Sequence, residues 1–505
     1  MFMKFGGYNL VQQYHTAKYL LRESNISVRI VKLCLAVLVL LVLWNLPSTT
    51  YGIPNLTIVE QRTIAVFVFA TLMWILEAVP AWNTSVTVIV ILLFCVSDSS
   101  LWCMVQGHDA ESLGSMLSYK KLMACFSDPI IMLFIGGFIL AIAATKSGLD
   151  VKLARVMLKP FGTKSENVSL GFLLVTGIFS MFLSNTATAA MMLTFLAPVL
   201  KSLPANGKGK INLAMAIPVG ANIGGIGTPI GTPPNAIALK FLNDPEGLNL
   251  GIGFGQWMLF MFPLAILLLL IAWRVLLIFF PFTQKRIGLK IEDNQKRVLK
   301  PWQDVVVYVT FILTVLLWMT DKVSGVNSNV VAMLPVGVFC LSGVIGRRDL
   351  EEINWSVLWM VAGGFALGVA LQDTGLASHL IQTIPFNTWS PILMIVGSGV
   401  LCYLMANFIS HTATANLLIP ILAMAGMSAS ENLASLGGVS TLLIGVAMGS
   451  SLAMVLPIST PPNALAHATG LIEQKQMIRV GIIMGVIGLT LGYVMLIFLG
   501  QANFF

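Results

Sequence analysis

The sequence predicts an all-α polytopic membrane protein with an inverted repeat, two re-entrant hairpins, two broken helices and about 11 transmembrane helices. Only 10% of the 505 residues are charged and 57% are hydrophobic. A soluble globular chain is about 25% charged. Apolar runs of about 18 or more residues recur, and each can cross about 30 Å of hydrocarbon. Three polar motifs inside these runs also occur twice in the same order.

Nine apolar segments have the length of simple spans and polar residues on both sides: 30–46, 62–80, 82–97, 128–145, 252–281, 302–320, 328–346, 355–372 and 478–500. Four further stretches are too long for one span or are interrupted by Gly, Pro, Asn, Ser and Thr: 168–200, 211–242, 390–426 and 436–468. Non-helical backbone is tolerated at membrane depth only when it lines a cavity or is buried in protein. These four interrupted stretches are therefore the candidates for a functional site.

The repeated motifs are separated by nearly constant distances. FLSNTATA (182–189) and FISHTATA (408–415) lie 226 residues apart, the GGF steps (136–138 and 363–365) lie 227 apart, and the TPPNA motifs (232–236 and 460–464) lie 228 apart. Three predicted spans separate the two copies. Because that number is odd, the second copy enters the membrane upside down. An inverted-topology repeat is typical of secondary transporters, whose binding site lies at the repeat interface near the bilayer midplane.

The repeat predicts five parts of the chain. Residues 1–119 form an N-terminal cytoplasmic segment and scaffold helices, and 120–245 form the first repeat, with hairpin 166–202 and broken helix 211–242. Residues 246–349 are linking scaffold helices. Residues 350–470 form the second repeat, with hairpin 388–426 and broken helix 436–468, and 471–505 form the last helix. The stretches 149–162 and 375–386 have amphipathic helical spacing and are expected to lie in the interfaces, as arms of a mobile domain or as plain connectors.

The basic residues predict the orientation. With a cytoplasmic N-terminus and hairpins that enter and leave on one side, the inside loops hold 23 of the 29 Lys and Arg residues. This agrees with the positive-inside rule, so the net charge of +8 reflects topology and not nucleic-acid binding. The C-terminus is then outside. The short loops and the lack of a targeting segment favour a multi-pass protein of a cell membrane, expected to be a bacterial inner membrane.

Each repeated tip has the chemistry of a helix start inside the membrane. Ser184 and Asn185 sit between two apolar halves, and Ser and Asn are preferred N-cap residues. The free N–H groups of the following half-helix give the tip a positive end. Ser410 and His411 are expected to do the same from the opposite side. The alternative for the repeated motifs is close helix packing, which Ser, Thr and Gly also favour.

The TPPN motifs must interrupt their helices, because adjacent prolines remove N–H donors and clash with the preceding turn. The freed carbonyls and hydroxyls can coordinate a cation, whereas half-helix N-termini can face an anion. Near the motifs the polar groups are hydroxyls, amides, carbonyls and one imidazole, with no Lys or Arg. Hard cations prefer oxygen ligands of this kind. The sequence therefore predicts an anion site with adjacent cation sites.

The paired tips, the paired TPPNA breaks and the inverted repeat together resemble the divalent anion:sodium symporter family over about residues 30–500. The resemblance implies a homodimer with a scaffold domain and a transport domain that moves as an elevator. It implies substrate contacts from Asn185, Thr186, Thr232, Pro233, Ser410, His411, Thr412, Thr460 and Pro461. It implies a first sodium site at Ser180, Ser184, Asn185 and the backbone around Gly227, and a second at position 406, Ser410, His411 and the backbone near Ser459.

The sequence departs from the family pattern at the second sodium site. Position 406 is Ala where the first copy has Ser180, and position 411 is His where the family usually has Asn. Both changes remove oxygen ligands from a hard-cation site. The imidazole can itself carry positive charge, which suggests fewer sodium ions, proton coupling or sodium-independent exchange. Alternatively, neutral His411 caps the tip and binds substrate while sodium still binds.

The expected function is secondary active transport of small divalent anions, most of all C4-dicarboxylates such as succinate, malate and fumarate, with sodium as the coupling ion and no other cofactor. The alternatives are a sodium-independent dicarboxylate exchanger, with His411 in place of a cation, and a sulfate or citrate carrier. An arsenite-type carrier and a channel are weaker alternatives. An enzyme is not expected, because the adjacent Ser410 and His411 do not face each other and no third group orients them.

Overall fold

The computed structural model describes residues 26–200, 203–204, 207–245, 247–287, 299–383, 386–502 and 504. The N-terminal cytoplasmic segment predicted for the first part of the chain, up to residue 25, and most of the basic loop 283–301 lie outside the described residues. Within the described ranges the chain is helical, and its only strand-like pairings are two isolated bridges. The prediction of an all-α polytopic membrane protein is confirmed.

Eight helical segments in the described residues are long and apolar enough to cross a membrane, or nine if one bent pair counts as a span. The uninterrupted ones are α2 (Ile26–Asn45), α3 (Ile58–Leu76), α8 (Pro129–Ser147), α14 (Phe254–Phe279), α15 (Pro301–Met319), α20 (Trp355–Asp373) and α27 (Gln474–Gln501). Helix α4 (Ala81–Cys95) and the pair α17 (Ser328–Val331) and α18 (Met333–Leu341) are shorter. The predicted count of about 11 spans stays a prediction.

The helix ends follow local sequence signals. Thr57 and Glu60 form a capping box at the start of α3, in which each side chain pairs with the other residue's backbone N–H. Asp128 caps α8 by accepting a hydrogen bond from the backbone of Ile130, and Pro129 occupies the first helical position. These caps satisfy backbone groups that would otherwise lose their partners at the helix start.

Two helix pairs carry the polar tips. Helix α10 (Ser165–Phe182) ends before Leu183, and α11 (Asn185–Leu200) begins directly after Ser184. In the second copy, a π-helical turn (Leu393–Gly397) leads into α22 (Ser398–Ala406), and α23 (His411–Ser428) begins after Ser410. A bend of 94° then separates α23 from the short segment Ser430–Leu436, which contains α24 (Ser430–Leu433).

Two further helices are interrupted at the TPPN motifs. Helix α12 (Lys208–Gly225) stops before the first motif, and α13 (Pro233–Leu242) begins at its first proline. Helix α25 (Gly438–Ser451) and α26 (Pro461–Ala468) repeat this arrangement. In both motifs the first proline is the first helical residue, where its missing N–H has no intrahelical partner to lose.

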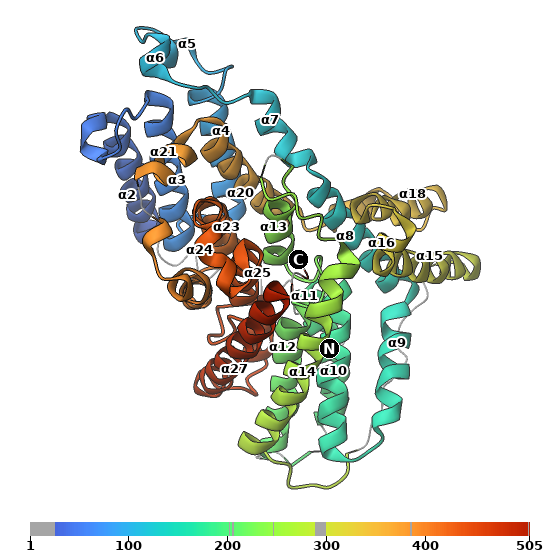
Figure 1. The fold of residues 1–505 in the computed structure, drawn as a ribbon. Helices are drawn as coiled ribbons and strands as arrows, with labels where there is room; N and C mark the ends of the chain where they lie inside the picture. Colours follow the sequence, from blue (N-terminus) through green and yellow to red (C-terminus); the bar gives the residue numbers. More distant parts are fainter. Residues whose placement is uncertain are drawn as a thin grey trace.

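The broken helices form the centre of the molecule (Figure 1), with α2, α3 and α4 on one side and α15, α16 and α18 on the other. Helix α12 packs against α10 and α14, and α25 packs against α22, α23 and α27. Helix α13 contacts α23 and α25, and α26 contacts α11 and α12, so each short half packs against the other copy. Glycine allows the closest approach: a Cβ on Gly224 would lie 2.1 Å from the carbonyl oxygen of Gly177.

Both predicted amphipathic stretches contain helices, α9 (Leu149–Leu158) after α8 and α21 (Leu376–Thr383) after α20. Helix α21 is held to α3 by an ion pair of 2.9 Å between His379 Nδ1 and buried Glu60 Oε1. Their role as arms stays a prediction. The remaining short helices are α5 (Trp102–Val105), α6 (Ala110–Leu113), α7 (Tyr119–Ala124), α16 (Asp321–Ser324) and α19 (Arg347–Glu351), with 3₁₀ turns at Ser48–Tyr51, Cys125–Ser127, Lys159–Phe161, Phe386–Thr388 and Ala434–Leu436.

Candidate functional site

The first tip gathers three oxygen atoms around one hydroxyl group. Ser180 Oγ, fully buried on α10, lies 2.6 Å from Asn185 Oδ1 and 2.8 Å from the backbone oxygen of Ala221 on α12. A serine hydroxyl carries a single proton, so it can donate to only one of these two acceptors at a time. Converging oxygens with too few protons between them are the ligands that a hard cation prefers.

The other predicted residues of the first sodium site lie differently. Ser184 Oγ accepts a hydrogen bond from the backbone N–H of Ala187, at 3.2 Å, and so caps α11. A Cβ on Gly225 would lie 2.9 Å from Asn185 Nδ2, whereas a Cβ on Gly227 would meet the side chain of Met181. The backbone beside Asn185 is therefore that of Gly225, two residues before the position that the resemblance indicated.

The first broken helix is held open by an asparagine that the sequence analysis did not single out. Asn235 is fully buried, and its Nδ2 lies 3.0 Å from the carbonyl oxygen of Gly225 and 2.8 Å from that of Thr228. These carbonyls lost their helical partners at the break. Thr232 is buried directly before α13, and Pro233 is half-buried at its first position. The detectable signal was an asparagine three residues after the threonine of TPPN.

The second broken helix repeats this arrangement and adds a link between the copies. Asn463 Nδ2 donates to the carbonyl oxygens of Met454, at 2.8 Å, and Leu456, at 3.0 Å. Its Oδ1 accepts a hydrogen bond of 3.0 Å from Asn222 Nδ2 on α12. Thr460 caps α26 by accepting from the backbone N–H of Asn463. One buried amide thus satisfies the second break and joins it to the first repeat.

The second tip is built around an imidazole. His411 Nε2 lies 2.6 Å from the carbonyl oxygen of Ala453, in the loop between α25 and α26. Ser450 Oγ donates to the backbone oxygen of His411 at 2.8 Å, and Ser410 caps α23 by accepting from the backbone N–H of Ala413. Because a carbonyl oxygen only accepts, Nε2 is the nitrogen that carries the proton in this contact.

Two residues near the second tip serve the backbone. Ser459 Oγ donates to the backbone oxygen of Asn407 at 2.9 Å and accepts from the N–H of Leu456 at 3.0 Å. Asn407 Oδ1 accepts from the N–H of Val455 at 2.8 Å. Asn407 was another residue that sequence reasoning missed, because the first copy has Met181 at the corresponding position. These contacts fasten the end of α22 to the loop before α26.

The remaining predicted substrate residues differ in accessibility. Thr186 is half-buried at the start of α11, whereas Thr412 on α23 is only 7% exposed. Thr460 is 3% exposed and Pro461, the next residue, is exposed. The two tips therefore present different side chains to their surroundings, although their sequences match at six of eight positions.

Comparison with known proteins now identifies the architecture. The model of the family described as the sodium:sulfate symporter transmembrane region matches residues 27–502. The chain belongs to this family. It is 30% identical over 480 residues to the sodium-dependent dicarboxylate transporter SdcS of Staphylococcus aureus strain USA300, covering 86% of each chain. The SdcS protein of strain NCTC 8325 matches with the same identity and coverage.

A solved structure supports the fold. The antimetabolite efflux pump MtrF of Neisseria gonorrhoeae superposes with a TM-score of 0.51 and 13% sequence identity, over 82% of this chain and 94% of that one. The predicted family is confirmed, and the chain is a multi-pass membrane protein of a transporter family and not an enzyme. The Ser410–His411 pair therefore has no hydrolytic role.

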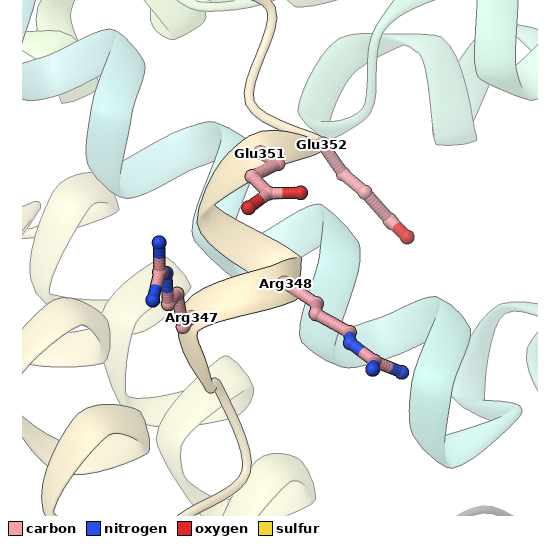
Figure 2. A pocket seen from close by; sticks show the side chains of 4 residues that line it. All are labelled: Arg347, Arg348, Glu351 and Glu352. Atoms are coloured by element: carbon pink, nitrogen blue, oxygen red, sulfur yellow. The ribbon is translucent and has the colours of Figure 1, made fainter.

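The largest hollow along the described residues lies away from the tips. It has a volume of about 450 Å³ and is lined by the exposed side chains of Arg347, Arg348, Glu351 and Glu352 on and after α19. Figure 2 shows Arg348 and Glu352 extending to the same side of this short helix. Two positive and two negative side chains in the open offer a divalent anion no net attraction, so this hollow is not the transport site.

A second hollow touches the first tip. It is lined by Phe134, Gly137 and Phe138 of α8, by Phe182, Leu183 and Ser184 of the tip and by Ile230 of the first break. Its volume is about 10 Å³, which is barely enough for one water molecule. The repeated GGF step therefore closes over the tip. Access of a larger solute to Ser184 from this direction requires α8 and the tip to separate.

Proposed function

We propose that this chain is a sodium-coupled secondary active transporter of small divalent anions, with C4-dicarboxylates such as succinate, malate and fumarate as its substrates. The observation that carries the proposal is the convergence of two polar tips and two broken helices from the two copies, joined by the 3.0 Å Asn222–Asn463 hydrogen bond. This is the geometry of a midplane binding site at a repeat interface. The printed name of SdcS supports both the coupling ion and the substrate class.

The substrate is held by hydroxyls, amides and helix N-termini. Helices α11, α13, α23 and α26 all begin at the repeated motifs, and each start presents free N–H groups and a positive dipole end to an anion. The proposed contacts are Asn185, Thr186, Thr232, Pro233, Ser410, His411, Thr412, Thr460 and Pro461. Because the motifs themselves contain no Lys or Arg, part of the substrate's charge must be balanced by a bound cation.

Sodium fits the first tip. Ser180 Oγ, Asn185 Oδ1 and the Ala221 carbonyl converge within 3 Å of the hydroxyl, and they are neutral oxygen donors of the kind that sodium accepts. Sodium bound there would place a positive charge beside the start of α11 and favour an anion at the same tip. Ser184 and the Gly225–Gly227 backbone complete the proposed ligand set.

Alternating access is proposed to occur by an elevator movement of the hairpins and broken helices against the remaining helices. The closed 10 Å³ hollow between α8 and the first tip supports this, because a dicarboxylate cannot reach the tip unless these elements move apart. Helices α9 and α21 would be the arms. A homodimer embedded in the lipid bilayer, a cytoplasmic N-terminus, an external C-terminus and a bacterial inner membrane complete the proposal.

The test is uptake of labelled succinate into proteoliposomes, with and without a sodium gradient and with and without internal dicarboxylate. Uptake that requires sodium and no internal substrate is the expected result. S180A should raise the sodium concentration needed for half-maximal uptake. S169A is the matched control, because Ser169 is also fully buried on α10 but bonds to Asn212 and not to the tip. Equal sodium dependence of both variants would contradict the assignment of the first sodium site.

A second candidate function is favoured by the His411–Ala453 contact: exchange of one dicarboxylate for another without sodium. In that case a protonated imidazole would supply the positive charge. Uptake that requires internal dicarboxylate and ignores sodium would select this candidate. Failure to take up succinate under either condition would refute the dicarboxylate assignment, and sulfate and citrate would be the next substrates to examine.

A further inference from the structure

The two tips are equivalent in sequence but not in the oxygen atoms that they expose. Ser180 and Asn185 of the first copy correspond to Ala406 and His411 of the second, at the same offset of 226 residues. The first pair supplies a hydroxyl and an amide oxygen that lie 2.6 Å apart. The second pair supplies a buried methyl group and an imidazole. Two of the side-chain oxygens that form the first site are therefore missing from the second.

The imidazole also occupies the backbone oxygen that remains. Ala453 corresponds to Gly225, which lies against Asn185 in the first copy. In the second copy, His411 Nε2 approaches the Ala453 carbonyl to 2.6 Å and directs an N–H at its lone pair. A sodium ion needs that same lone pair, and it cannot bind where a proton already points at the oxygen.

The neighbouring oxygens are committed to backbone donors. Ser459 Oγ accepts from the N–H of Leu456, and Asn407 Oδ1 accepts from that of Val455. Ser410 Oγ accepts from the N–H of Ala413. Recruiting any of these oxygens to a cation would leave a buried N–H without a partner, at a cost of about 1–3 kcal/mol each. The residues present at the second tip do not fit a sodium ion.

We propose that His411 closes the second cation site of this chain, so that cation binding is restricted to the first tip. The inference rests on the proposed function for the identity of the cation, but it concerns the difference between the two tips. It holds whether the imidazole is neutral or charged, because an N–H at Nε2 is present in both forms that can make this contact. It makes His411 the residue that sets how many cations accompany each substrate.

The experiment measures equilibrium binding of radioactive sodium to the purified full chain, without any transport step. The A406S/H411N variant restores the side chains of the first tip at the second. We expect it to bind about one more sodium ion per chain than the unchanged protein. The mirror variant S180A/N185H transfers the second tip's side chains to the first, and we expect it to bind about one fewer.

Each outcome distinguishes the inference from the proposed function. Equal binding by the unchanged protein and A406S/H411N would overturn the inference, as would binding of two sodium ions by the unchanged protein, whichever variants fold. If the unchanged protein binds no sodium and A406S/H411N binds one, the inference stands and the proposed sodium coupling fails. Size-exclusion profiles of H411N and A406S as single variants identify any loss of binding that is due to misfolding.

Discussion

Asn463 is expected to contribute more to stability than any neighbouring polar side chain of the second break. Its amide makes three hydrogen bonds, to Met454 O, to Leu456 O and from Asn222 Nδ2, and it is 2% exposed. Each buried hydrogen bond contributes about 1 kcal/mol net, so N463A should cost about 3 kcal/mol. N222A removes only the link between the copies and should cost about 1 kcal/mol.

The measurement is the thermal unfolding midpoint in one detergent at one sodium concentration, followed by tryptophan fluorescence. Because membrane proteins often unfold irreversibly, the ratio of the two midpoint shifts is the informative quantity. We expect N463A to shift the midpoint roughly three times as far as N222A. N235A is the matched variant in the first copy, and it should resemble N463A. Shifts of equal size for N463A and N222A would refute the assignment of the two carbonyl contacts.

Three further predictions use the same unfolding assay. G136A should destabilise the protein by about 1–3 kcal/mol, because its Cβ would lie 2.2 Å from a backbone carbonyl, whereas the adjacent G137A has 3.5 Å of room and should be nearly neutral; comparable losses would contradict this packing. K240M should cost about 1–2 kcal/mol and D128N less, because the 2.8 Å ion pair joins a carboxylate that is 9% exposed to an ammonium that is 32% exposed, and Asn keeps the cap; the reverse order would be inconsistent with it. Burial raises the pKa of Glu352 above its usual 4.5, so its favourable contribution is present below pH 4.5 and is lost as the pH rises through the folded-state value; E352Q should therefore flatten the pH dependence just above 4.5, and an unchanged slope would count against the shift.

The helix breaks could be predicted because their causes are local. Adjacent prolines cannot continue a helix, and Ser and Asn favour the position before a helix start, so the interruptions at residues 183–184 and 226–232 followed from the sequence. The capping role of Ser410 followed in the same way. The membrane environment followed from composition alone, because so few charges cannot cover a soluble surface.

The partners of the freed carbonyls could not be predicted, because they depend on which helices pack together. The sequence analysis omitted Asn235, Asn407 and Asn463, whose amides pair with backbone groups up to 48 residues away. It also centred the first sodium site on Gly227, although the close approach of α10 and α12 brings Gly225 to Asn185. A shift of two residues turns a helical position by more than half a turn, which motif spacing cannot resolve.

The sequence by itself determined that the chain spans a membrane, belongs to an anion transporter family, breaks its helices at four repeated motifs and carries His at one tip where the other has Asn. Only the tertiary structure decided what that difference does. The fold brings His411 to the carbonyl of Ala453, 42 residues along the chain, and leaves Asn185 among oxygens that lack protons. The physical reason is that coordination depends on the direction of lone pairs in space, which packing between helices fixes and residue order does not.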